Sequence, residues 1–143
     1  MPLLREELEV ARPLEEVFAF IGDFVNTKDW DPGVEDARNE TGGPIGVGTR
    51  YAVDVVFNGR KLPMTYEVTE WDPPNRVVLK GEGSMVTAVD DIRFEATVTG
   101  TRIRYSADLR LKGILRAAEP LLKGRFDETG RKAMEGMKRA LEG

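Results

Sequence analysis

From about Val34 onward, apolar and polar side chains alternate along one segment after another, and a short turn signal separates each segment from the next. Alternation with a period of two is typical of a strand that buries one face, and short turns can join only antiparallel neighbours. Asn58-Gly59 is the strongest turn signal, because both central positions of a type I′ hairpin need a positive φ. The sequence therefore predicts five consecutive antiparallel strands, within residues 48–57, 60–71, 76–81, 85–98 and 101–111.

The segments on either side of this meander add one more strand and two helical regions. Residues 3–10 alternate as a strand, and residues 12–24 then place apolar side chains at helical spacing. Residues 113–143 carry the apolar stripe of a long helix, which Pro120 is expected to kink or restart because proline has no N–H. This order predicts an α+β fold, in which one long helix covers one face of a curved antiparallel sheet. At this length we expect a single domain over residues 1–143.

Three glycines, Gly124, Gly130 and Gly136, fall inside the predicted long helix. A glycine in a helix interior costs up to about 1 kcal/mol relative to alanine. Their six-residue spacing does not keep them on one face, so they do not form a packing motif. We therefore expect a break or local flexibility in the helix. The alternative is that one or two of them leave room for a ligand beneath it.

The composition excludes several classes of function. The chain has no cysteine and no histidine, which rules out disulfides, thiolate catalysis and cysteine zinc sites, and removes the commonest general base. We predict no metal and no cofactor. A net charge of −4 opposes binding to nucleic acid, and no apolar run approaches the roughly 18 residues of a membrane span. The acidic N-terminus lacks the features of a secretory signal, so we expect a cytoplasmic protein without stable membrane insertion.

Four stretches of the sequence together resemble a known family. They are "VFAFIGDFVNTKDWDPGV", "GVGTRY", "VTEWDPPNRVVLKG" and "GTRIRY", the last of which precedes the final helix. In this order they resemble the START-like superfamily, also called SRPBCC, and within it the polyketide cyclase/dehydrase group, over residues 3–141. The resemblance implies a helix-grip fold, a seven-stranded antiparallel sheet wrapped around a long C-terminal helix with two short helices near the N-terminus. It also implies an apolar cavity, in which members bind lipids, sterols, quinones, plant hormones or polyketide intermediates.

Strand alternation predicts which side chains face the helix, independently of this resemblance. All three tyrosines, Tyr51, Tyr66 and Tyr105, lie on the inward parity. They are either polar contacts for a ligand or core aromatics whose hydroxyls reach the sheet rim. Inward strand positions and the helix stripe, together with Trp30, which the resemblance places at the cavity, give the predicted ligand-binding residues: Trp30, Tyr51, Val53, Val55, Met64, Tyr66, Leu79, Ala88, Asp90, Tyr105, Leu115, Leu122 and Phe126.

Asp90 is the main anomaly, because its apolar neighbours at the same parity place its carboxyl on the buried face. Burial raises the pKa of a carboxyl toward the range useful for proton transfer, so Asp90 is the candidate catalytic acid or base. Glu6 lies on an inward parity in the same way. The alternatives for Asp90 are an arginine partner, or a bulge that exchanges it with Asp91 and turns it to solvent.

Asp23, Asp29 and Asp31 surround Trp30 in the stretch "DFVNTKDWDPGV". An aspartate at a helix end or before a proline favours a cap or a turn, and the spacing lacks the pattern of a calcium loop. We therefore expect structural roles for the three aspartates. By the resemblance, Trp30 lies where the short helices close the cavity, as a ligand contact or a plug.

Three functional hypotheses follow. The first is a binding protein whose partner is a hydrophobic or aromatic small molecule, such as a lipid, a polyketide or a quinone-like compound. The second is a polyketide cyclase/dehydratase-type enzyme that uses Asp90 and a cavity tyrosine, because enzymes of this group work largely by folding a reactive chain in a shaped pocket. The third is a protein-interaction module that uses the outer face of the sheet. No oligomeric state is predicted.

Overall fold

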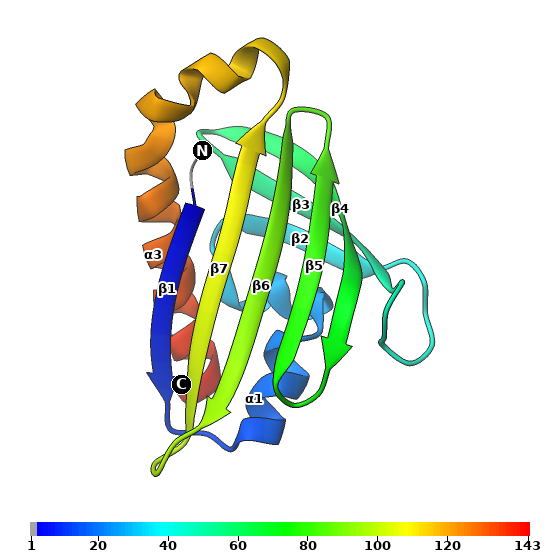
Figure 1. The fold of residues 1–143 in the computed structure, drawn as a ribbon, viewed down its shortest axis with the longest axis vertical. Coiled ribbons are helices and arrows are strands. Elements are labelled where there is room, and N and C mark those ends of the chain that lie inside the picture. The colour runs from blue at the N-terminus through cyan, green and yellow to red at the C-terminus, as the bar shows by residue number, and fades with distance from the viewer. Residues whose placement is uncertain (1–2) are drawn as a thin grey trace.

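The computed structural model describes residues 3–143, which contain one seven-stranded sheet (Figure 1). Every neighbouring pair of strands is antiparallel, and the strand order across the sheet is β1-β7-β6-β5-β4-β3-β2. The strands are β1 (Leu3–Val10), β2 (Val34–Asn39), β3 (Arg50–Phe57), β4 (Arg60–Asp72), β5 (Arg76–Gly83), β6 (Val86–Ala96) and β7 (Thr101–Leu111).

The five strands of the predicted meander are confirmed as β3 to β7, and the first predicted strand is β1. Asn58 and Gly59 have φ values of 55° and 77° at the β3–β4 turn, as a type I′ hairpin requires. The alternation did not single out β2 as a strand. In β2 only Ala37 is fully buried, and its pairing with β3 shifts register between Val34 and Asp36, which obscures the period of two.

The helices are α1 (Leu14–Ile21), η1 (Phe24–Asn26), α2 (Thr27–Trp30), η2 (Gly113–Ala118) and α3 (Glu119–Glu142). The first predicted helix is therefore divided, since α1 ends at Ile21 and the side chain of Asp23 accepts a hydrogen bond from the Val25 N–H to cap η1. Pro120 restarts the C-terminal helix as expected. It lies in the first turn of α3, where a missing N–H costs no hydrogen bond.

The predicted break at the glycines of the long helix is wrong, because α3 is continuous from Glu119 to Glu142. Tertiary packing explains one of the three glycines. A Cβ added to Gly136 would lie 2.0 Å from the carbonyl oxygen of Trp30, so glycine is needed for α2 and α3 to approach each other. Gly124 has open space around it, and Gly130 lies over the interior near Leu4.

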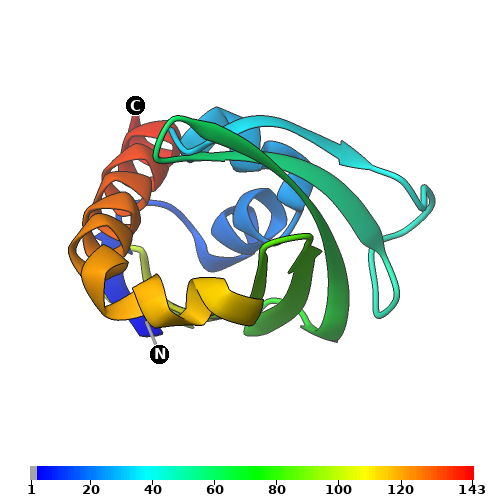
Figure 2. The same ribbon diagram turned by 90° about the horizontal axis from the view of Figure 1, so that it is seen from above.

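The sheet curves, and α3 lies along its open side next to β1, while α1 and α2 lie toward one end (Figures 1 and 2). Helix α3 contacts β1 and α2, and α1 contacts β6. The apolar faces of the strands and of α3 meet in one core, which includes Val53, Ile103 and Met137. This is the helix-grip arrangement that the resemblance implies, so the predicted fold class is confirmed.

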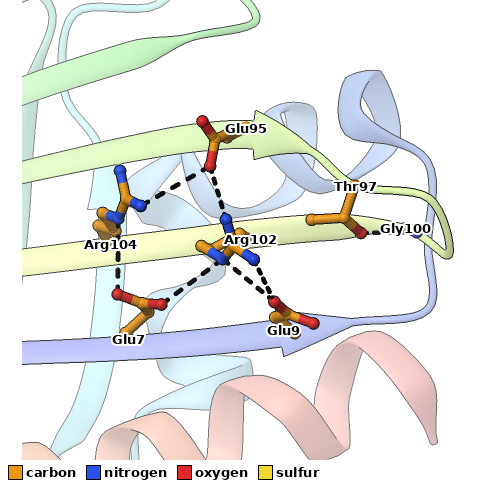
Figure 3. Close-up of polar contacts among 7 residues, drawn as sticks. All are labelled: Glu7, Glu9, Glu95, Thr97, Gly100, Arg102 and Arg104. Atoms are coloured by element: carbon orange, nitrogen blue, oxygen red, sulfur yellow. Dashed lines mark hydrogen bonds and ion pairs between the residues drawn. The ribbon is translucent and has the colours of Figure 1, made fainter.

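The outer face of the sheet carries a network of ion pairs across β1, β7 and β6 (Figure 3). Arg102 on β7 lies directly between Glu9 and Glu95, with nitrogen–oxygen distances of 2.7 Å and 2.9 Å. Arg104 pairs with Glu7, directly opposite on β1, at 3.5 Å, and reaches Glu95 diagonally on β6 at 3.8 Å. Opposite charges on neighbouring strands favour this register. Because successive side chains of a strand point to opposite faces of the sheet, the residues between these charged positions point into the core.

Candidate functional site

A pocket of about 170 Å³ lies between the concave face of the sheet and α3; we call it the inner pocket. Strands β1, β3, β4, β6 and β7, the α2 region and α3 all contribute side chains to its lining, which is predominantly apolar. Eight of the predicted ligand-binding residues line it: Trp30, Val53, Val55, Met64, Tyr66, Asp90, Tyr105 and Phe126.

The other five predicted residues do not line the inner pocket. Tyr51, Leu79 and Ala88 face inward as predicted but are closed off inside the core. The ring of Tyr51 packs against Phe24, with ring centroids 6.1 Å apart. Leu115 and Leu122 are partly exposed, because η2 and the first turn of α3 precede the part of the helix that reaches the pocket.

Asp90 and Tyr105 form the hydrogen-bonded centre of the pocket's polar part. Asp90 lies on β6 directly opposite Ala107 of β7, the pairing is continuous along both strands, and the residue is 6% exposed. The bulge that would have turned Asp90 outward is therefore absent, and Asp91 takes the outer position, paired with Arg76. The Tyr105 hydroxyl donates to Asp90 Oδ2 at 2.5 Å, while Asp90 Oδ1 has no hydrogen-bond partner.

Burial raises the pKa of Asp90 to about 7. The hydrogen bond from Tyr105 opposes this rise, and the nearby charge of Asp31 adds to it. Burial and the charge of Asp90 raise the pKa of the phenol of Tyr105, and the same two causes raise that of Tyr66. Both tyrosines are therefore neutral at physiological pH. Asp90 is the group in this cluster that can exchange a proton near neutrality.

Asp31 is a pocket residue that the sequence reasoning missed. It has the expected turn role, because its Oδ1 accepts a hydrogen bond from the Gly33 N–H at 2.8 Å. It also lines the inner pocket, and burial raises its pKa to about 6 against the effect of that hydrogen bond. The residue follows a four-residue helix, which is too short to show a periodicity, so no pattern in the sequence could indicate which way its side chain points.

Trp30 supplies the second unpartnered polar atom of the pocket. Its side chain is 3% exposed, and its indole Nε1–H has no hydrogen-bond partner. The indole packs edge-on against Tyr105, with ring centroids 6.2 Å apart and an interplanar angle of 67°. Trp30 and Asp90 therefore both contact the same tyrosine. A buried N–H without an acceptor is costly, and a ligand could supply that acceptor.

The ring of Tyr66 packs over a glycine on the neighbouring strand. Gly81 on β5 is paired with Tyr66 on β4, and a Cβ at Gly81 would lie 2.6 Å from the tyrosine ring. The ring also packs edge-on against Phe24, with ring centroids 5.3 Å apart. These contacts hold Tyr66 against the sheet, where it forms part of the pocket wall.

Two stacked rings, one at the end of β3 and one on α3, form part of the wall of the inner pocket. Phe57 and Phe126 stack with ring centroids 4.8 Å apart and an interplanar angle of 14°. Beside them, Arg125 donates a hydrogen bond to the side-chain oxygen of Asn58 at 2.8 Å. Phe57 also lines a second, more polar hollow together with Asn58 and Arg125.

Two absences apply to residues 3–143. No group of three acidic side chains in this part of the chain is placed to hold a metal ion. No helix in the same range is both long enough and apolar enough to cross a membrane.

Comparison with known proteins gives one family and many similar structures. The family model described as "Polyketide cyclase / dehydrase and lipid transport" matches residues 1–142. None of the curated proteins that were compared matches the chain.

Three solved structures share the fold over almost the whole of both chains. A protein from Thermus thermophilus is 23% identical with a TM-score of 0.82, covering 98% of this chain and 97% of its own. A START superfamily protein from Mycobacterium smegmatis is 15% identical with a TM-score of 0.83, covering 97% and 96%. The Zhui aromatase/cyclase from a Streptomyces species is 14% identical with a TM-score of 0.80, covering 96% and 92%.

Proposed function

We propose, from the premise that this chain belongs to the polyketide cyclase/dehydrase and lipid transport family, that it binds a hydrophobic or aromatic small molecule in the inner pocket. The observation that carries the proposal is an apolar pocket of about 170 Å³ into which few polar groups project. An apolar site with a few placed polar groups both holds and orients a ligand.

The volume limits the size of the ligand. An apolar cavity of about 150 Å³ accommodates benzene, whereas sites for drug-sized ligands hold roughly 300–1,000 Å³. The inner pocket therefore suits one ring or a short chain. A long lipid or a fused-ring polyketide requires the pocket to widen.

Native mass spectrometry of the protein purified from its own cells, together with titration by an environment-sensitive dye, tests this function. We expect a retained small molecule, and dye binding that Ala133→Phe abolishes, because Ala133 lines the pocket and a phenyl ring there would fill it. Glu135→Phe on the exposed side of α3 is the control and should leave dye binding unchanged. A wild-type protein that retains no ligand and takes up no dye contradicts the proposal.

The contact between Asp90 and Tyr105 supports a second candidate function, that of a cyclase or dehydratase. A carboxyl with a pKa of about 7 can take a proton from a carbon between two carbonyl groups and return it to a leaving hydroxyl, with the neutral Tyr105 holding it in place. Turnover of a candidate polyketone by the wild type and by Asp90→Asn distinguishes catalysis from binding. Equal turnover by the two proteins removes Asp90 from any mechanism.

A further inference from the structure

The charged groups that line the inner pocket are all acidic. Within residues 3–143, three carboxyls line it, those of Glu6, Asp31 and Asp90, and neither lysine nor arginine does. The chain has no histidine that could supply a positive charge. An anionic ligand would therefore lose its hydration without gaining a counter-charge, and would face carboxyls of the same sign. This lining disfavours a carboxylate such as that of a fatty acid.

Two buried polar atoms of the pocket lack partners and define what a ligand can offer. One is Oδ1 of Asp90, in a side chain that is 6% exposed, and the other is Nε1–H of Trp30, in a side chain that is 3% exposed. Both residues contact Tyr105, at 2.5 Å for the Asp90 hydrogen bond and 6.2 Å between the Trp30 and Tyr105 rings. Asp90, Tyr105 and Trp30 therefore form one polar cluster, in a pocket whose lining is mainly apolar.

A hydroxyl group can satisfy the hydrogen-bonding capacity of either atom, whichever way Asp90 is protonated. It can donate to the Asp90 carboxylate, accept from the protonated acid, and accept from the Trp30 indole. An ammonium group cannot accept from the indole, and a carboxylate cannot donate to an ionised Asp90. Burial raises the pKa of Asp90 to about 7, so both of its states occur near neutral pH.

We infer that the inner pocket selects a neutral, hydroxyl-bearing compound of about one ring, of the phenol type, and discriminates against carboxylates of the same size. This inference rests on the proposed binding function and adds the chemical class of the ligand. The hydroxyl contacts Asp90 in the polar cluster, and the ring occupies the apolar space bounded by Val53, Met64 and Ala107.

Three probes that share one ring and differ in one substituent test the inference. They are 4-methylphenol, 4-methylbenzoate and toluene, with dissociation constants measured by ligand-detected NMR at neutral pH. In the wild type we expect 4-methylphenol to bind about tenfold more tightly than 4-methylbenzoate. In Asp90→Leu, the preference for 4-methylphenol over toluene should fall about tenfold, because toluene never used the carboxyl.

Two further variants separate this effect from general damage. Asp90→Asn keeps an acceptor but removes the charge, so it should retain the preference for phenol over toluene and lose part of the discrimination against 4-methylbenzoate. Asp91→Asn, on the outer face of the same strand, should change neither ratio. Circular dichroism checks that each variant is folded.

The outcomes distinguish this inference from the proposed function. Equal binding of 4-methylphenol and 4-methylbenzoate to the wild type, or an unchanged phenol-to-toluene ratio in Asp90→Leu, overturns the hydroxyl selectivity while the binding function stands. Failure of all three probes and of the dye to bind the wild type overturns both.

Discussion

Replacing Asp90 by asparagine should remove a large part of the pH dependence of stability, so that the variant gains stability relative to the wild type as the pH rises. Burial raises the pKa of Asp90 from 3.8 to about 7, so the folded protein holds this proton more tightly than the unfolded chain does. The stability from the neutral acid is fully present below pH 3.8 and is lost as the pH rises through 7. At 1.36 kcal/mol per pKa unit, the loss amounts to about 4 kcal/mol.

Asparagine has nearly the same shape, carries no charge at any pH, and can still accept the hydrogen bond from Tyr105. Its amide group introduces a fixed offset in stability, because one buried polar atom remains without a partner. The informative quantity is therefore the change with pH. We expect the free energy of unfolding of Asp90→Asn, minus that of the wild type, to increase by about 4 kcal/mol between pH 4 and pH 8. Urea unfolding at several pH values measures it.

Asp91→Asn on the same strand is the matched control, because the pKa of Asp91 is shifted in the opposite direction. Partial burial alone would raise the pKa of Asp91, but the hydrogen bonds from Arg76 and Arg93 hold it below 3.8. That stability is present above pH 3.8 and is lost only at lower pH. Asp91→Asn should therefore be destabilised by a constant amount from pH 5 to pH 8. If the difference for Asp90→Asn is also flat over that range, the reasoning about a buried, neutral carboxyl is refuted.

One other substitution and one matched pair of substitutions test separate contacts. Tyr105→Phe removes the hydrogen bond that lowers the pKa of Asp90, so this pKa, and with it the pH at which stability is lost, should rise. NMR titration of the carboxyl measures the pKa, and an unchanged value would contradict the hydrogen bond. Gly136→Ala should destabilise by about 3 kcal/mol, since its Cβ would meet the carbonyl of Trp30 at 2.0 Å. Gly124→Ala, with open space around it, should stabilise by up to about 1 kcal/mol, and equal thermal shifts in both glycine variants would argue against the close helix contact.

Alternation was sufficient to locate Asp90, because β6 pairs without a register shift along its whole length. In a regular strand each side chain's face follows from its parity, so an isolated carboxyl among apolar neighbours can be recognised without a structure. The same rule gave the inward faces of Tyr66 and Tyr105. In β2, where the register shifts between Val34 and Asp36, the rule did not identify the strand.

Parity does not say how far along a strand the pocket extends. Tyr51, Leu79 and Ala88 all face inward, yet core packing covers them, whereas Asp90 directly beside Leu79 reaches the pocket. That distinction depends on where α1, η1 and α3 meet the sheet. Such contacts join segments far apart in the chain, so no local pattern in the sequence carries them.

Gly136 shows how such a distant contact builds the site. In the sequence it is only an unfavourable residue in a helix. The structure explains it by a contact with α2, because the carbonyl of Trp30, the last residue of that helix, lies against the Cα of Gly136. This approach sets the position of the Trp30 ring against Tyr105, and that of Asp31 at the pocket wall. The polar part of the pocket therefore has two sources. Asp90 and Tyr105 lie on regular strands, and their inward positions can be predicted from the alternation and the strand register. Trp30 and Asp31 lie at the end of a short helix that a glycine of α3 allows to come close, and their positions depend on that tertiary contact.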